Sequence, residues 1–155
     1  FNGVLDILVE NMGRINYGAR ITQSIKGING PVVIEGNEIT GNWKMYKMPM
    51  SEMPNVDALP SANTKGMPTL YAGTFNLDTT GDTFLNMETW GKGIVFVNGF
   101  NLGRYWKRGP QQTLYLPGCL LKKGENKIVV FEQQNDNQQT SISGQTTPIL
   151  DKLVQ

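Results

Sequence analysis

The residues best suited to contact a ligand lie in one short stretch, residues 98–106. Arg104 offers a planar fork of hydrogen-bond donors, and the neighbouring Tyr105 and Trp106 offer flat rings. Such a mixture suits a sugar, because an aromatic face packs on the C–H side of a pyranose while amide and guanidinium groups bond its hydroxyls. The candidate sugar-contact residues are Asn98, Asn101, Arg104, Tyr105, Trp106 and Trp90, with Trp43 as a further aromatic platform.

A structural role explains the same residues equally well. Asn98 is suited to a tight turn together with Gly99. Arg104 could bind the backbone of residues 107–112 or form an ion pair with Glu132. The aromatic rings are large enough to fill a core or an interdomain surface. We therefore expect turn, core or interdomain packing for this set, and a sugar subsite is the alternative.

Catalytic groups are scarce in this sequence. It contains no histidine, the usual general base near neutral pH, and its lone Cys119 has no second cysteine to pair with. A retaining glycosidase needs two carboxyl groups about 5–5.5 Å apart, whereas the carboxylates here are scattered among turns and strand ends. Glu10, Glu88 and Glu132 lie inside strand-like runs, where we expect surface or ion-paired roles. We therefore predict no catalytic residue and no cofactor. We also predict no metal site, since no spacing typical of calcium ligands occurs.

The charge balance argues against nucleic acid or an anionic membrane as a partner. There are 14 Lys and Arg residues against 13 Asp and Glu residues, and the net charge is +1. Gly91-Lys92-Gly93 matches no phosphate-binding loop, because a strand and not a helix should follow it. No apolar run approaches the roughly 18 residues of a membrane span. The chain opens at Phe1 and soon enters an apolar run, so we expect a piece of a longer, soluble protein.

Short apolar runs rich in Val, Ile and aromatic residues, bounded by Gly, Asn, Asp or Pro, predict an all-β protein. The expected strands cover residues 5–12, 32–35, 38–40, 43–48, 70–77, 83–89, 94–97, 100–106, 113–116 and 126–132, with a weaker signal at 149–154. This pattern predicts an antiparallel β-sandwich or jelly roll. The polar run 133–139 is expected to form a solvated loop.

Several glycines have a predicted backbone role. Asn98-Gly99 is the strongest hairpin signal, because a type I′ turn needs a positive φ at both central residues. Gly36-Asn37 should form an equivalent turn earlier in the chain. Gly124 should supply the left-handed residue of a turn before the run 126–132, and Gly103 should mark a β-bulge or a close backbone approach.

A stretch rich in proline and methionine, residues 48–68, interrupts the strand pattern and excludes a central strand or a continuous helix there. We expect one β-sandwich domain over residues 1–155 with residues 49–68 as a crossing loop, because a block of about 45 residues is too small to hold a core alone. In the alternative, residues 1–48 are the end of a preceding β-domain. The methionines should fill gaps at a domain interface, or else form a soft partner-binding surface.

Two parts of the chain resemble a known family. Residues 90–106 (WGKGIVFVNGFNLGRYW), followed by 109–111 (GPQ) and 114–117 (LYLP), are similar to the last β-domain of the β-galactosidases of glycoside hydrolase family 35. Residues 5–18 (LDILVENMGRINYG) resemble the same family, at the end of the preceding β-domain or its junction with the last one. The two parts occur in the order that the family has.

The resemblance implies a β-sandwich that is a jelly roll of the galactose-binding-domain-like type. It also implies that this jelly roll is attached to a (β/α)₈ barrel that hydrolyses terminal non-reducing β-D-galactosides by a retaining mechanism with two glutamates. Those glutamates lie on barrel strands that this chain does not contain, so no catalytic residue carries over. The implied partners are the barrel of the same parent polypeptide and, for a sugar-binding role, galactosides. The compartment stays open, with a periplasmic or secreted parent as one expectation.

From these observations we expect a non-catalytic scaffold domain that packs against the barrel and rims the entrance of its active site. The first alternative is an autonomous carbohydrate-binding module that recognises galactose-containing glycans. The second is a protein-interaction domain, which predicts an exposed apolar patch around the methionine-rich stretch.

Overall fold

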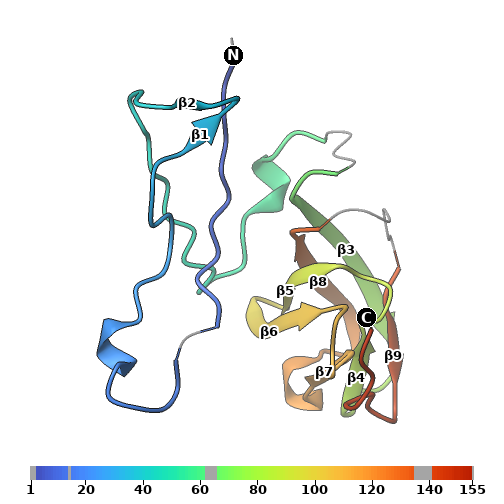
Figure 1. The fold of residues 1–155 in the computed structure, drawn as a ribbon. Coiled ribbons are helices and arrows are strands. Elements are labelled where there is room, and N and C mark those ends of the chain that lie inside the picture. Colours follow the sequence, from blue (N-terminus) through green and yellow to red (C-terminus); the bar gives the residue numbers. More distant parts are fainter. Residues whose placement is uncertain (1–2, 14, 62–65, 135–140, 155) are drawn as a thin grey trace. The chain divides into compact units, whose positions relative to one another are not determined.

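The computed structural model describes residues 3–13, 15–61, 66–134 and 141–154. The chain divides into two compact units, residues 1–47 and residues 48–155. All strand pairs of the described residues are antiparallel, and the helical segments are short 3-10 turns. The predicted all-β fold class is confirmed (Figure 1).

Residues 1–47 contain little regular structure. They hold the 3-10 helix η1 (Ile21–Gln23) and a small hairpin of β1 (Val33–Ile34) and β2 (Asn37–Glu38). The predicted Gly36-Asn37 turn is wrong by one residue. Glu35 and Gly36 occupy the two central positions with φ of 50° and 81°, whereas Asn37 already pairs with Ile34. Glycine still supplies one of the two positive φ angles that a type I′ turn needs.

Two predicted strands of this unit, residues 5–12 and 43–48, are not strands among the described residues. Their apolar composition favours an extended backbone, but a strand exists only where a neighbouring backbone completes the hydrogen-bond ladder. None of the described residues up to residue 47 is buried. This unit therefore has no core of its own within the described part of the chain.

Residues 48–155 form two antiparallel sheets. The four-stranded sheet has the order β3 (Thr69–Leu77), β8 (Gly124–Glu132), β5 (Lys92–Val97), β6 (Phe100–Trp106). The three-stranded sheet has the order β7 (Thr113–Leu116), β4 (Thr83–Asn86), β9 (Ser143–Gln145). The 3-10 helices η2 (Val56–Ala58) and η3 (Gly118–Leu120) precede β3 and β8. The predicted β-sandwich is confirmed in this unit.

The β5–β6 hairpin has the predicted turn. Asn98 and Gly99 have φ of 50° and 90°, and Val97 pairs with Phe100 across the two-residue loop. The predicted bulge is also present, because the pairing shifts by one residue between Val95 and Phe96, next to Gly103 with its φ of 108°. Gly124 has the predicted left-handed conformation, with φ of 88°, at the start of β8.

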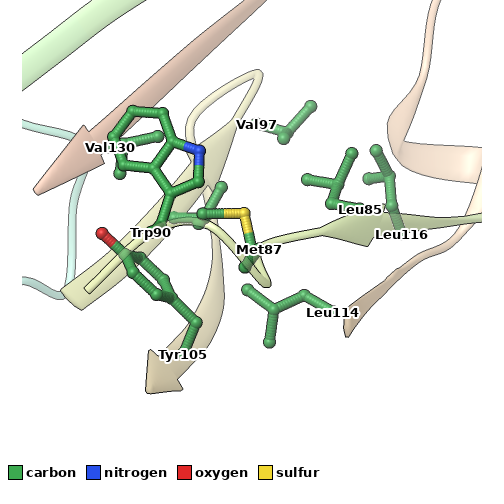
Figure 2. Packing of buried hydrophobic residues seen from close by; sticks show 9 residues of the cluster. Leu85, Met87, Trp90, Val97, Tyr105, Leu114, Leu116 and Val130 are labelled. Carbon is green, nitrogen blue, oxygen red and sulfur yellow. The ribbon is translucent and has the colours of Figure 1, made fainter. Parts of the chain in front are cut away.

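The main core lies between the two sheets (Figure 2). The four-stranded sheet and the loop before it supply Trp90, Val95, Val97, Tyr105 and Val130, and the other sheet and its flanking loop supply Leu85, Met87, Leu114 and Leu116. Side chains alternate between the two faces of a strand, so every second residue of β5 enters this layer. The alternate residues of β5, Lys92, Ile94 and Phe96, face the opposite side of their sheet.

The outer face of the four-stranded sheet has a smaller cluster. Ile94, Phe96 and Val129 are buried there, and Met50, Met53, Val56 and Leu70 pack against them. Part of the methionine-rich stretch therefore fills gaps on this sheet, as methionine does well in irregular spaces. Met48 and Met67, near the ends of the stretch, are more than half exposed.

The predicted strand at residues 149–154 is wrong. This segment runs beside residues 108–113 through isolated backbone hydrogen bonds, such as Gln112 N to Ile149 O at 2.9 Å and Lys152 N to Pro110 O at 3.0 Å. Proline lacks the N–H that a regular ladder needs, which limits pairing here. The strand that the sequence did not predict is β9, because Ser-Gly-Gln has no β-forming signal. The predicted loop 133–139 lies mostly outside the described residues.

Candidate functional site

The β5–β6 hairpin distributes the predicted contact residues over two faces of its sheet. Tyr105 points into the core and is only 4% exposed. Arg104 and Trp106, its neighbours along β6, point to the outer face, where Arg104 is exposed and Trp106 is half-buried. The three side chains therefore do not converge on one pocket, although they are adjacent in sequence.

Asn98 and Asn101 both have their amides engaged within the fold. The Nδ2 of Asn98 donates to Leu120 O and to Asn126 Oδ1, each at 2.8 Å, and its Oδ1 accepts from Lys127 N at 3.0 Å. The Nδ2 of Asn101 donates to Met50 O at 2.7 Å, and its Oδ1 accepts from Gly103 N at the same distance. These amides fix the hairpin turn and its bulge.

Trp90 is a core residue and is 3% exposed. Its Nε1 donates to Ser141 O at 3.0 Å, so the polar atom of the indole has a partner inside the sandwich. Tyr71 and Tyr105 approach the indole edge-on, with ring centroids at 5.3 and 6.4 Å (Figure 2 shows Tyr105 beside Trp90). Trp90 thus closes one end of the main core.

A buried carboxylate, Glu132, organises the polar end of this core. Its oxygens accept from the backbone nitrogens of Gly91 at 2.7 Å and Lys92 at 2.9 Å, from Gln134 N at 2.7 Å, and from the Tyr105 hydroxyl at 3.2 Å. Burial first, and then the charge of Glu132 together with its hydrogen bond, raise the pKa of Tyr105 far above its usual value of 10.0. The phenol therefore stays protonated as a donor to the carboxylate.

Gly93 leaves space for this arrangement. It pairs with Tyr105 on one side and with Glu132 on the other, so the three residues form one row across the sheet. A Cβ at position 93 would collide with the backbone carbonyl of Phe131 and would lie 2.6 Å from the Tyr105 hydroxyl, which only glycine avoids. The sequence predicted a surface or ion-paired role for Glu132, and the surface role is wrong, because this residue is only 3% exposed. The glycines of Gly91-Lys92-Gly93 were the available signal, because glycine inside a strand often marks a close approach.

The outer face presents Trp106 between two cationic side chains. Lys92 Nζ lies 5.0 Å from the centre of the indole, and Arg108 Cζ lies 5.6 Å from it. Both are within the range of a cation–π contact. The Nε1 of Trp106 is buried and has no hydrogen-bond partner within the described residues. This surface, with exposed Arg104 beside it on β6, is the part of the predicted site that a ligand can reach.

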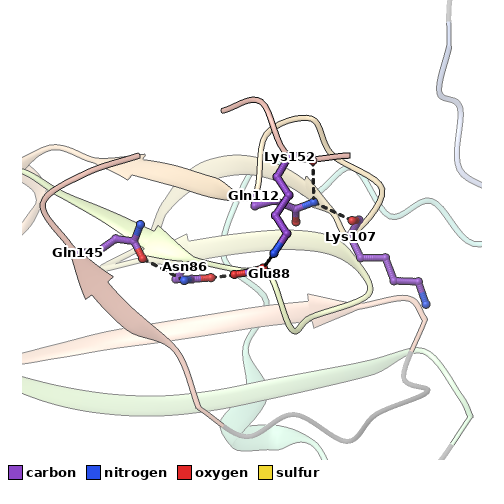
Figure 3. Close-up of polar contacts among 6 residues, drawn as sticks. All are labelled: Asn86, Glu88, Lys107, Gln112, Gln145 and Lys152. Carbon is purple, nitrogen blue, oxygen red and sulfur yellow. Dashed lines mark hydrogen bonds and ion pairs between the residues drawn. The ribbon is translucent and has the colours of Figure 1, made fainter. Parts of the chain in front are cut away.

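Polar contacts also hold the end of the chain to the sandwich (Figure 3). The Nε2 of Gln112 donates to Lys107 O at 2.7 Å and to Lys152 O at 3.3 Å, and Lys152 forms an ion pair with Glu88. Asn86 links the Glu88 backbone to Gln145 of β9. The carboxylate of Glu88 is thus engaged in a structural contact at the surface.

Within the described ranges, no group of three or more His, Cys, Asp or Glu side chains is placed to hold a metal ion. In the same part of the chain, no helix has the length and hydrophobicity of a membrane-spanning segment.

A cleft of about 790 Å³ opens between the two sheets. It is bordered by β3 and β9, the strands at the edges of the two sheets. Its wall includes aromatic and aliphatic side chains of the main core, such as Tyr71, Phe75 and Ile128. None of the described residues that line it is charged.

Comparisons with known proteins agree with this architecture. Residues 1–49 match the family model described as the first all-beta domain of beta-galactosidase, and residues 68–126 match the model of the galactose-binding domain of beta-galactosidase. The second match covers the sandwich from the start of β3 to the start of β8.

Full-length relatives extend the match. The human beta-galactosidase-1-like protein 2 is 42% identical over 138 residues, which cover 84% of this chain and 21% of that protein. Beta-galactosidase 17 of Arabidopsis thaliana is 40% identical over 162 residues, covering 91% and 23%, and a beta-galactosidase of Xanthomonas manihotis is 41% identical over 112 residues, covering 72% and 18%. The chain spans about a fifth of the length of these relatives, in which this region is part of a larger polypeptide. The chain therefore belongs to the β-galactosidase family and carries its non-catalytic β-domain sequence.

Proposed function

We propose that this chain is the accessory scaffold of a β-galactosidase, which packs against a catalytic barrel elsewhere in the same polypeptide. In this proposal the barrel, a member of glycoside hydrolase family 35, hydrolyses terminal non-reducing β-D-galactosides. The observation that carries it is the structural use of the hairpin residues: Asn98, Asn101, Trp90 and Tyr105 all have their polar atoms bonded within the sandwich. Residues committed in this way hold a fold together and are not available to a substrate.

The same proposal assigns residues 1–48 to the end of a preceding β-domain and residues 49–68 to the crossing between it and the sandwich. Support comes from the match of residues 1–49 to a separate β-domain of the family and from the absence of buried residues in this unit among those described. Met50 and Met53 of the crossing pack on the outer face of the sandwich. A terminal piece of another domain would lack a core in the same way.

The test is a hydrolysis assay with a stability control. We expect the purified chain to unfold cooperatively and to release no nitrophenol from p-nitrophenyl β-D-galactoside above the buffer rate. The parent polypeptide should hydrolyse this substrate, and deletion of the region equivalent to residues 48–155 should lower its melting temperature. Turnover by the purified chain alone, or an unchanged melting temperature after the deletion, would overturn the scaffold proposal.

A second candidate function, a galactoside-binding module, is favoured by the surface around Trp106. Here a half-buried indole lies between Lys92 and Arg108, and its buried Nε1 has no protein partner among the described residues. An indole face with nearby cations and a spare donor is a plausible wall for a sugar ring. The description of the matched family model as galactose-binding adds support.

Titration of the chain with galactose, lactose and galactan, monitored by NMR, distinguishes the two functions. Trp106→Ala is the test variant, and Trp43→Ala is the matched control because Trp43 is a partly exposed tryptophan of the other unit. Saturable binding that Trp106→Ala abolishes and Trp43→Ala leaves intact supports the module. Unchanged spectra at high sugar concentration support the scaffold alone.

A further inference from the structure

The sandwich is incompletely filled on the side where β3 and β9 form its edges. The cleft of about 790 Å³ reaches Leu85, Leu116 and Val130, which belong to the main core itself. A cleft with this floor brings core side chains close to water, although protein interiors are normally packed without large voids. As far as the described residues show, the apolar interior of the unit is therefore incomplete along this side.

β3 is a long edge strand without the features that usually protect an edge. It runs for nine residues, or about 30 Å, and pairs with β8 on one side. Within the described residues, no strand pairs with its other side. Its sequence contains no charged residue and no proline, whereas exposed edges are normally blunted by charges, prolines or a covering segment. Residues Ala72 to Thr74, at its centre, are exposed.

We propose that this edge is an interaction surface for one further β-strand, supplied by a part of the parent β-galactosidase polypeptide outside this chain. The strand pairs with β3, and its alternate apolar side chains enter the cleft and complete the core. This inference rests on the proposed function, because the chain spans only 18–23% of the relatives named above and the strand comes from the remainder. A covered edge explains why β3 carries no protective charge.

The chemistry of the cleft favours a strand over two other occupants. A second copy of this chain would pair its own β3 edge here and bring a second open cleft, so neither cleft would be filled. A sugar needs several convergent polar groups, whereas the floor is aliphatic and the described lining residues are uncharged. Of the neutral polar residues in the lining, Thr74 and Asn76 alternate toward the other face of β3, and the Thr83 hydroxyl donates to Gln145 O. A strand with alternating apolar residues supplies both the missing backbone hydrogen bonds and the missing side chains.

Gly73 provides a selective test. It lines the cleft, has an ordinary φ, and a Cβ added to it would meet only Ile128 Cγ2, at a comfortable 3.9 Å. Gly73→Lys therefore fits the isolated chain, since the long side chain can reach water through the open cleft. The matched control is Thr74→Lys, which puts the same charge on the same strand. Thr74 also borders the cleft, but its side chain alternates with that of Gly73 and lies on the opposite face, on the same side as Leu70 of the outer cluster.

In the parent polypeptide, Gly73→Lys should lower the melting temperature by roughly 5 °C or more, and Thr74→Lys by less than about 2 °C. In the isolated chain the two variants should melt within about 2 °C of each other. Equal effects in the parent would overturn the inference, even where deletion of residues 48–155 destabilises the parent. That combination leaves the scaffold proposal standing, so the two failures are distinguishable.

A photo-crosslink identifies the occupant directly. A benzophenone amino acid placed at position 73 of the parent should capture a peptide from outside this chain with apolar residues at alternate positions. Hydrogen exchange at Ala72 to Leu77 should be at least about tenfold slower in the parent than in the isolated chain. Crosslinks to a second copy or only to residues 48–155, or galactose-induced shifts of Tyr71 and Phe75 in the isolated chain, would each contradict the proposal.

Discussion

Residues 48–155 and residues 1–47 differ in how they treat their apolar side chains. Among its described residues, the first region buries thirteen hydrophobic side chains, including Val95, Phe96 and Val129 with no exposed surface. The second region buries none of its described residues, and Val4, Tyr17 and Met45 are 85–94% exposed. Residues 1–47 do contain apolar side chains, so a shortage of them does not explain the lack of burial. Paired strands in sheets that pack face to face can exclude water from a shared core. The hairpin of β1 and β2, whose strands have two residues each, cannot.

A composition that favours strands is therefore not sufficient to form a core. Residues 5–12 are as apolar as β5, but β5 has β6 and β8 as neighbours and a second sheet over its inner face. Burial of apolar area is the main favourable contribution to folding, at about 25 cal/mol per Å². A region of 47 residues without a packed layer gains little of it. The exposed apolar residues of residues 1–47 are consistent with a piece of a larger β-domain.

The strongest test of this comparison is to separate the two regions. We expect residues 48–155 alone to show a single cooperative thermal transition, because both core clusters lie within them. Residues 1–47 alone should show no cooperative transition and a far-ultraviolet spectrum typical of an unordered chain. Circular dichroism and calorimetry of both fragments check this. A cooperative transition of the shorter fragment would contradict the conclusion that residues 1–47 have no core of their own.

A matched pair of tryptophans gives the next largest effect. Trp90→Ala should lower the free energy of unfolding by about 3–5 kcal/mol, because it removes a buried indole and its bond to Ser141. Trp43→Ala should change it by less than about 0.5 kcal/mol, because Trp43 is 46% exposed in the region without a core. Urea unfolding of both variants measures the two values. Similar losses would show that residues 1–47 also contribute buried packing.

How far the sequence predicts this fold depends on how local each feature is. The Asn98-Gly99 turn, the bulge at Gly103 and the left-handed Gly124 are set by the backbone conformations that those residues allow, and all three were predicted correctly. The strand β9 has no local signal, and its pairing with β4 provides the reason for its conformation. Residues 149–154 have a local signal but lie against a segment that contains Pro110.

The candidate site shows the same limit. Alternation along β6 implies that Tyr105 lies on the face opposite to Arg104 and Trp106, so their separation follows from sequence alone. Which face the second sheet covers does not follow from the local sequence, because it depends on β4 and β7 packing over β5 and β6. The role of Glu132 depends on groups from two other strands. The accessory-domain assignment is confirmed by the family matches, and galactoside binding stays a prediction.

The third test examines the buried carboxylate of the ordered region. Glu132→Gln should lower the free energy of unfolding by about 2 kcal/mol, because one accepting oxygen becomes an NH₂ group that faces backbone donors. Glu125→Gln is the matched control, since Glu125 lies on the same strand and is exposed. Chemical denaturation of both variants measures the difference. Equal values would show that the carboxylate contributes no more inside the sandwich than at its surface.

A pH series on Tyr105 gives a smaller effect with a definite sign. Its pKa is raised in the fold above the usual 10.0, so the phenol stays protonated when the unfolded chain begins to lose its proton. This contribution to stability is therefore complete below pH 10 and declines as the pH rises above it. Tyr105→Phe should lower stability by about 1 kcal/mol at pH 8, and the loss relative to wild type should shrink toward about pH 11.5. A constant difference across this range would contradict the raised pKa of Tyr105, of which burial is the first cause.

The smallest expected effect concerns an exposed carboxylate of the same ordered region. Asp82 accepts from Gly118 N at 2.8 Å and from the Tyr115 hydroxyl at 2.7 Å, and these bonds, the backbone one first, lower its pKa below 3.8. A depressed pKa stabilises the fold above pH 3.8, and this contribution is lost as the pH falls through the folded-state value. Asp82→Asn should therefore be slightly less stable than wild type at neutral pH and indistinguishable from it near pH 2. The exposed Asp78→Asn, in the neighbouring turn, is the control for the loss of a surface carboxylate. Water screens the exposed Asp82, so its substitution should lower the free energy of unfolding by less than Glu132→Gln does. An equally large loss would mean that burial does not decide how much a carboxylate contributes to stability.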